Sequence, residues 1–155
     1  MAQRPSEPLR QEHERFQRRL VELHTLAERL RGDKGKVESV ELQRVFDWLV
    51  SELLPHAADE EENLYPLVDG LTLEGGRATA TMLIDHVVIR EKVHDFGKAV
   101  ASLAGGVGGR RRIELRDRAR ILAYQLEAIL ALHMKKEEEV YFELIDACAT
   151  PQQMQ

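Results

Sequence analysis

Apolar residues along this chain recur every three or four positions, the period of an α-helix that buries one face. Three glycine-containing segments, residues 32–35, 68–76 and 105–109, interrupt the pattern, and no candidate strand lies between them. The pattern predicts four helices, at about residues 6–31, 36–67, 77–104 and 110–147. Short connections make successive helices antiparallel neighbours, so the predicted fold is all-α, an up-down-up-down four-helix bundle.

Each predicted helix carries one inward-facing stripe. The apolar members run from Leu9 to Leu30, from Leu42 to Leu64, from Met82 to Leu103, and from Leu115 to Leu144 with Val140 among them. Six polar residues fall on the same stripes and are therefore predicted to face the core. They are His13, His56, Glu60, His86, His133 and Glu137.

These polar residues are predicted to share one layer of the bundle. His13 lies about 18 residues before the end of the first helix and His56 about 20 residues after the start of the second, which puts both roughly 30 Å from the first connection. His86 and His133 lie at similar distances, about 18 and 23 residues, from the third connection. The core is therefore expected to hold a polar layer.

Two similar motifs supply most of this layer. HAADEEENLY (56–65) and HMKKEEEVYF (133–142) both begin with histidine and have three glutamates from the fifth position. A spacing of four residues places the histidine and the first glutamate on one helical face. Asp59, three residues after His56, lies at about as favourable an angle around the helix as Glu60 does. Glu61, Glu62, Glu138 and Glu139 are interpreted as solvated charges or as supports for the inner residues.

Buried carboxylates are costly unless they take up protons or find cations, and no lysine or arginine on the stripes is placed to neutralise both glutamates. The two similar helix pairs favour two metal ions, each held by two imidazoles, with the carboxylates between them. Imidazole with bridging carboxylate suits iron, with manganese as second choice. The alternative is a metal-free polar layer whose histidines are merely hydrogen-bonded.

Other single residues have plainer interpretations. His24 and His94 lie off the layer and are expected to make surface or boundary contacts. The single cysteine, Cys148, is in phase with the apolar stripe and is predicted to be buried. Pro55 either bends the second helix so that it re-aims His56, or is tolerated at a bend already present.

Composition narrows the class of protein. With 155 residues, we expect a single domain over residues 1–155 with its core at about 6–148. The net charge of −5 gives no case for binding nucleic acid or an anionic membrane, and residues 110–112 are expected to be a solvated helix start. No signal peptide or membrane span is evident, and one cysteine suits a reducing compartment, so a cytoplasmic location is expected.

The ordered set of His13, His56-x-x-x-Glu60, His86 and His133-x-x-x-Glu137 resembles the hemerythrin-like (HHE cation-binding) family. The segment GGRATATMLIDHVVIREKV (75–93) is similar to that family's third helix, and the similarity covers about residues 9–147. The resemblance implies two non-haem iron ions joined by an oxo or hydroxo bridge. One ion would bind His13 and His56, the other His86 and His133, with Glu60 and Glu137 bridging.

The resemblance also implies that the ligand is a small oxidant: dioxygen, nitric oxide or hydrogen peroxide. Catalase- or peroxidase-like turnover is one form of this chemistry; a sensor of oxygen, nitric oxide or iron, or an iron-storage or donor module, is the alternative. The oxygen-carrying hemerythrins have His-x-x-x-His in the third helix, whereas here Arg90 follows His86, which argues against familiar oxygen carriage. Arg90 either pairs with a bridging glutamate or a bound anion, or points outward. No protein partner is indicated.

Overall fold

The computed structural model describes residues 4–31, 39–72 and 77–150, and every regular element within them is helical, as predicted. The elements form four rods. The first is α1 (Glu7–Leu30) and the third is α5 (Ala80–Ala104). The second contains α2 (Ser39–Trp48), η1 (Leu49–Leu53), α3 (Leu54–Asp59), η2 (Glu60–Leu64) and α4 (Tyr65–Leu71). The fourth contains α6 (Gly109–Lys136), η3 (Glu137–Tyr141) and α7 (Phe142–Cys148), where η marks a π-helical turn.

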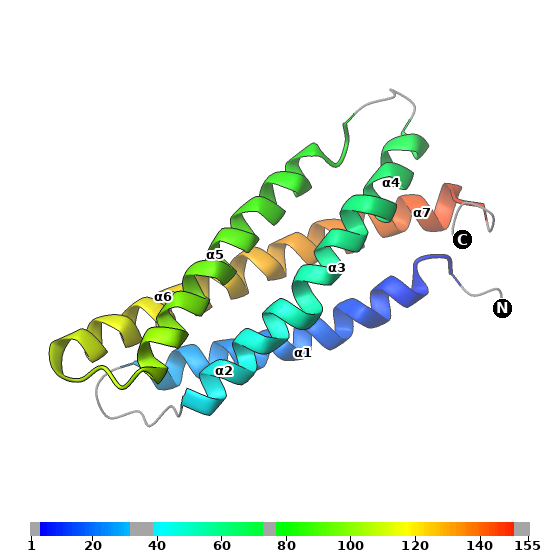
Figure 1. Cartoon of the computed structure of the whole chain (residues 1–155). Helices are drawn as coiled ribbons and strands as arrows, with labels where there is room; N and C mark the ends of the chain where they lie inside the picture. The colour runs from blue at the N-terminus through cyan, green and yellow to red at the C-terminus, as the bar shows by residue number, and fades with distance from the viewer. Residues whose placement is uncertain (1–3, 32–38, 73–76, 151–155) are drawn as a thin grey trace.

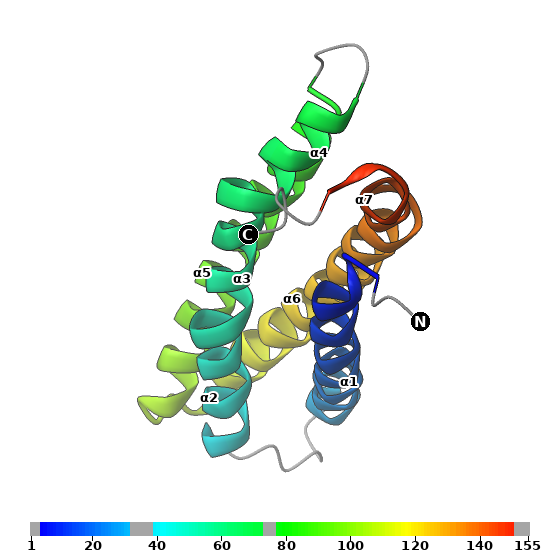
Figure 2. The same cartoon turned by 90° about the vertical axis from the view of Figure 1, so that its right-hand side faces the viewer.

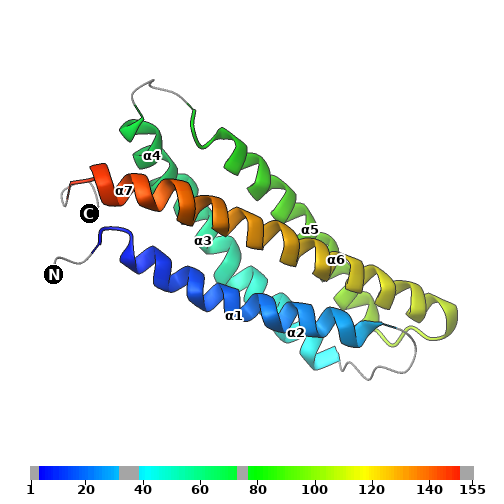
Figure 3. The same ribbon diagram turned by 180° about the vertical axis from the view of Figure 1, so that it is seen from behind.

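Successive rods run antiparallel, which confirms the up-down-up-down bundle (Figure 1). The fourth rod lies between α1 and α5 and packs against both, and α2 packs against α5. Figure 2 shows α1 beside the fourth rod and the second rod beside α5. The start of α1 and the end of α7 lie at the same end of the bundle (Figure 3). None of the described helices combines the length and apolar character needed to cross a bilayer.

The predicted rod boundaries are close to the observed ones. The second rod continues through Gly70 to Leu71, past the predicted end at 67, and the third begins at Ala80 rather than at 77. The proposed break at residues 32–35 and residues 73–76 of the second break lie outside the described residues. At the third break, Gly106 and Gly109 have positive φ values of 78° and 60°, which glycine adopts readily.

The core consists of two apolar clusters with the polar layer between them. The larger cluster includes Phe16, Leu53, Ile89 and Leu130; the smaller includes Leu64, Tyr65, Met82 and Phe142, with Leu9 packed against it. Along each rod one cluster is followed by a predicted histidine or glutamate and then by the other cluster. In α1, for example, His13 lies between Leu9 and Phe16. The polar groups are therefore enclosed by apolar packing on both sides.

Each of the two motifs contains a π-helical turn that begins at its glutamate. The N–H of Tyr65 donates to the carbonyl of Glu60, and the N–H of Phe142 donates to the carbonyl of Glu137, both over five residues. A π-helical turn has one residue more than an α-helical turn, so it shifts the phase of the side chains that follow. Such turns are frequent at functional sites.

Two predictions in the fourth rod are wrong, and the phase shift explains the first of them. Val140, predicted to be buried, is 57% exposed, and Tyr141, Phe142 and Ile145 take the inward positions. A stripe extrapolated with α-helical spacing fails at Val140 because the turn adds a residue. Cys148, also predicted to be buried, is exposed and is the last residue of α7. The start of α6 at residues 110–112 is exposed, as predicted.

A third π-helical turn explains how the second rod accommodates Pro55. The N–H of Leu54 donates to the carbonyl of Leu49, which closes η1 just before the proline. Pro55 then occupies the first turn of α3, where a missing N–H is tolerated. The proline therefore lies just after a π-helical turn and directly before His56.

Candidate metal centre

The structure brings all six predicted residues together in the polar layer. His13 comes from α1, His56 from α3, His86 from α5 and His133 from α6, while Glu60 and Glu137 begin η2 and η3. Five of the six are buried, and His56 is half-buried. The four rods each contribute at least one of these side chains, so the cluster depends on the whole bundle.

The carboxylate of Glu60 lies between two histidine pairs. Its Oε1 is 2.8 Å from Nε2 of His56 and 3.7 Å from Nε2 of His13. Its Oε2 is 3.3 Å from Nε2 of His86 and 3.9 Å from Nε2 of His133. Each oxygen therefore faces a different pair, and the pairs are those expected from the sequence.

Glu137 spans the same two pairs from the opposite motif. Its Oε2 is 3.5 Å from Nε2 of His13, and its Oε1 is 3.4 Å from Nε2 of His133. Among the described residues, two groups of three have ligand atoms that all lie within 4.8 Å of one another, so each group could hold one ion. They are His13, His56 and Glu60, and Glu60, His86 and His133.

Several buried atoms of this cluster form no hydrogen bond of good geometry with any of the described residues. They are Nε2 of His13, both carboxylate oxygens of Glu60, and Oε2 of Glu137. A buried polar atom without a partner costs about 1–3 kcal/mol, and more when it is charged. Imidazole nitrogens and carboxylate oxygens are donors to divalent cations such as zinc, manganese and iron, so the set fits cations.

A carboxylate lies behind each of the four histidines. Such a carboxylate accepts the Nδ1–H, orients the ring, and leaves Nε2 free to bind a metal. The four Nδ1 pairs are His13 with Glu138 (3.1 Å), His56 with Glu12 (3.3 Å), His86 with Glu61 (2.8 Å) and His133 with Asp85 (3.2 Å). All four imidazoles therefore direct Nε2 toward the centre.

These outer carboxylates were only partly predicted. Glu61 and Glu138 contact His86 and His13, so they have the supporting role that was one of the two roles expected of them. Glu12 and Asp85 were missed, because they lie outside the two similar motifs and have no fixed sequence spacing from the histidines that they support. Glu12 lies one residue before His13, and Asp85 one residue before His86. That adjacency is the signal in the sequence that could have indicated them.

Two cations lie outside this ring of carboxylates. Arg90 donates to Glu61 over 2.8 Å, and its side chain is 41% exposed. It thus pairs with neither predicted bridging glutamate, and it holds instead the carboxylate that supports His86. Lys136 donates to Asp85. Positive charge at the rim thus balances part of the negative charge of the outer carboxylates.

Tyr65 is the residue of the centre that sequence reasoning missed. Its hydroxyl donates to Oε1 of Glu137 over 2.8 Å and lies 3.1 Å from Nε2 of His86 and 3.3 Å from Nε2 of His133. Burial, and then the charges of Glu137 and Glu60, raise the pKa of Tyr65, so the phenol is a neutral donor here. Its oxygen lies within the cluster and could serve as a further ligand. The sequence signal for this residue was its position five residues after Glu60. A residue at that spacing faces the centre only when a π-helical turn lies between the two.

The electrostatics of the inner cluster favour positive charge. Burial opposes the charged form of His133, but hydrogen bonds and charge from Glu137 and Glu60 raise its pKa to about 10. Burial likewise opposes ionisation of Glu60, but the four imidazoles close to its carboxylate bring its pKa well below the usual value. Protons on the imidazoles and metal cations therefore compete for the same carboxylates.

Three other candidate residues lie outside the centre. Asp59 is exposed and accepts a hydrogen bond from Asn63 over 2.7 Å. His24 is exposed and pairs with Glu127 over 2.9 Å, and His94 is exposed, as expected for both. The four-residue spacing, rather than the three-residue one, thus identifies the acid that faces the core.

Comparison with known proteins gives the family. Residues 4–145 match the family described as "Hemerythrin HHE cation binding domain". Neither the curated proteins nor the solved structures gave a match. The family match covers most of the chain and all six inner residues, and the helical bundle encloses a histidine and glutamate cluster that could hold metal. The protein therefore belongs to the hemerythrin HHE cation-binding domain family.

Proposed function

We propose that the protein binds two non-haem iron ions at this centre and that it binds or reacts with a small oxidant: dioxygen, nitric oxide or hydrogen peroxide. One observation carries the proposal: the two oxygens of Glu60 face different histidine pairs, an arrangement suited to a carboxylate shared by two cations. His13 and His56 would hold one ion, and His86 and His133 the other. Glu137, from the other motif, contacts one histidine of each pair.

The donor set supports iron over other metals. A structural zinc site takes four ligands around one ion, whereas this cluster offers four imidazoles and two carboxylates around two positions. Imidazole and carboxylate together suit iron, with manganese as the second candidate. Iron supplies redox chemistry and open coordination positions to such a site.

The side chains around the centre have defined roles in this proposal. The outer carboxylates hold the histidines in one tautomer, and the two apolar clusters keep bulk water away. The hydroxyl of Tyr65 is a hydrogen-bond donor beside Glu137 and His86. It can therefore donate a hydrogen bond to a ligand bound at the centre without a path through solvent.

The first experiment is a metal analysis of protein purified in air, together with its ultraviolet-visible spectrum. The expected result is about two iron ions per chain and the charge-transfer absorption of a di-iron centre. Because a ligand that binds only the folded state stabilises it, chelation should lower the thermal midpoint. Glu60→Gln should lose iron and absorption, whereas Glu62→Gln, an exposed neighbour, should keep both. Protein that binds no iron and keeps its stability on chelation contradicts the proposal.

The second experiment separates turnover from binding. Steady release of dioxygen from hydrogen peroxide, in proportion to bound iron, indicates an enzyme. A reversible spectral change with nitric oxide, without turnover of peroxide, indicates a sensor or binding module. The Glu60→Gln protein is the control in both assays, because it should lack the iron.

A further inference from the structure

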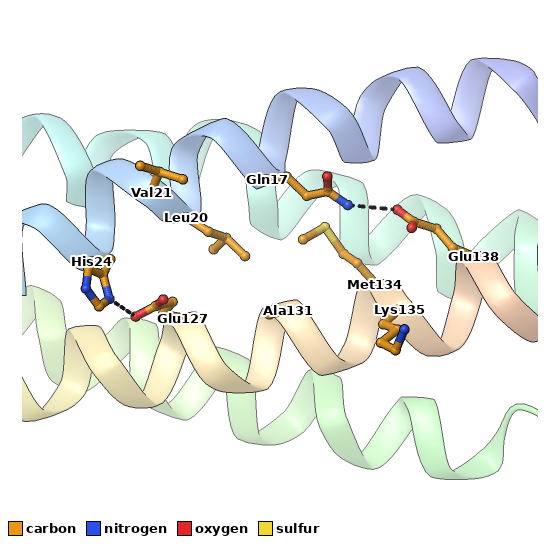
Figure 4. Close-up of a pocket in the computed structure, with 9 residues that line it drawn as sticks. All are labelled: Gln17, Leu20, Val21, His24, Glu127, Ala131, Met134, Lys135 and Glu138. Carbon is orange, nitrogen blue, oxygen red and sulfur yellow. Dashed lines mark hydrogen bonds and ion pairs between the residues drawn. The ribbon is translucent and has the colours of Figure 1, made fainter.

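A groove of about 580 Å³ lies between α1 and α6, on the outside of the bundle. Figure 4 shows a polar pair at each end of it, His24 with Glu127 and Gln17 with Glu138, and apolar side chains between them. It is lined by Gln17, Leu20, Val21, His24, Glu127, Ala131, Met134, Lys135 and Glu138. The rim is thus polar and the middle apolar.

The floor of the groove is formed by Leu20 and Met134, which point toward each other between the two helices (Figure 4). Both are buried, Leu20 with 6% and Met134 with 4% of its surface exposed. Methionine is unbranched and has several rotatable bonds, so its side chain moves aside more easily than a branched or aromatic one. The floor is therefore closed by the side chain best suited to open.

Met134 also lines a second, much smaller cavity. Its volume is about 10 Å³, about the smallest that holds one water molecule. Its lining includes His56, Glu60, His86 and His133, together with Leu53 and Met134. Among the described residues, Met134 lines both the groove and this cavity. Met134 is therefore the side chain at which the outer groove and the cavity beside the inner residues meet.

We propose that the groove between α1 and α6 is the entry route for an uncharged diatomic ligand, and that the Met134 side chain is its gate. This inference rests on the proposed function, because it assigns a path to the ligand of that centre. Leu20, Ala131 and Met134 offer no hydrogen bonds to a hydrated ion, so the middle of the groove favours dioxygen or nitric oxide over an anion. The size of residue 134 then sets the rate of entry.

Stopped-flow mixing of nitric oxide with the reduced, iron-loaded protein tests the gate. Met134→Ala should raise the association rate by about tenfold, which corresponds to an entry barrier lowered by about 1.4 kcal/mol. Met134→Phe should lower it, and Met134→Leu should leave it close to that of the unmodified protein. The spectra at saturation should be the same for all four proteins, since residue 134 acts on entry and not on the bound state.

Leu53→Ala is the matched control, because Leu53 lines the inner cavity but not the groove. It should enlarge the cavity and leave the association rate unchanged. Equal rates in all Met134 variants would overturn the proposal. So would an acceleration in Leu53→Ala as large as that in Met134→Ala, because entry would then depend on cavity size alone.

A second measurement needs no iron. In the metal-free protein with ¹³C-labelled methionine methyls, dissolved dioxygen should speed the relaxation of the Met134 methyl more than that of Met82, which is 1% exposed and lies in the smaller cluster. Leu20→Trp, which fills the groove, should reduce the effect at Met134. Equal effects at both methyls overturn the route. A chain that retains no iron refutes the proposed function instead, and this measurement still decides the route.

Discussion

The hydroxyl of Tyr65 donates to Oε1 of Glu137 over 2.8 Å and so joins the second rod to the fourth through the centre. Tyr65→Phe removes the donor and leaves a buried carboxylate oxygen without it. We expect the metal-free protein to lose about 1–3 kcal/mol of unfolding free energy in urea denaturation. We also expect the visible spectrum of the iron-loaded protein to change.

Tyr141→Phe is the control for this prediction. Its hydroxyl donates to the carbonyl of Ala78 over 3.1 Å, away from the inner cluster. This variant should lose some stability and keep the spectrum. If Tyr65→Phe matched the unmodified protein in both stability and spectrum, the hydroxyl would have no role in the centre.

The carboxylate behind His133 should control metal affinity. Asp85→Asn replaces the group that holds Nδ1 of His133 and also pairs with Lys136. Loss of such an outer partner typically weakens metal binding by about 10- to 100-fold. A competition titration with a chelator measures the change. Asp59→Asn, at an exposed position of the second rod, should leave the affinity unaltered. Equal affinities for both variants would show that Asp85 does not act on the metal.

The close approach of Phe46 to Gly97 predicts that Gly97→Ala changes the unfolding free energy in opposite directions with and without the Phe46 ring. A Cβ at Gly97 would lie 2.5 Å from Cε2 of Phe46, too close without a shift of the ring. Gly97→Ala gains about 1 kcal/mol of helix propensity but should lose about 1–3 kcal/mol to overpacking. The net change should be destabilising. In a Phe46→Ala background the same substitution should stabilise by about 1 kcal/mol. Urea denaturation of the four proteins gives both values, and the same sign in both backgrounds would refute the clash.

Asp146 should contribute to the stability of the bundle at neutral pH, and this contribution should be lost in acid. It accepts the N–H and the hydroxyl of Ser6 at 2.9 and 2.8 Å, and Arg10 lies 3.3 Å away. Burial would raise the pKa of Asp146, but these partners lower it. A carboxyl with a lowered folded pKa stabilises above its unfolded pKa, and the contribution is lost as the pH falls through the folded value.

Asp146→Asn should therefore destabilise the protein by about 1–2 kcal/mol near pH 7, and the difference should shrink below about pH 4. Thermal midpoints measured from pH 3 to pH 7 test this. Glu143→Gln is the control, because Glu143 also pairs with Arg10 but its side chain is 61% exposed. It should change stability little at any pH. A constant difference between Asp146→Asn and the unmodified protein across this range would contradict the linkage.

The four rods and the inner layer were predictable because both depend on local spacing. The three- and four-residue period identified the buried faces, and counting from the connections gave His13 and His56 the same depth. The pairing of the histidines around Glu60 follows from that geometry. Most of the bundle and the six inner residues needed no knowledge of side-chain contacts.

The errors have one main physical source. Val140 was misplaced and Tyr65 overlooked because an α-helical period was carried past Glu60 and Glu137, where π-helical turns begin. Glu12 and Asp85 were overlooked for another reason: contacts between rods depend on how the helices rotate against one another. Sequence spacing within one helix contains no information about that rotation.

The π-helical turns at Glu60 and Glu137 also set a condition for transplanting this cluster. Four histidines and two glutamates can be grafted onto straight helices at a four-residue spacing. On such a scaffold the residue five positions after each glutamate would turn toward solvent, as Val140 does here. A designer who copies the ligands without the extra residue in each motif would obtain a cage that lacks the phenol of Tyr65 and the ring of Phe142.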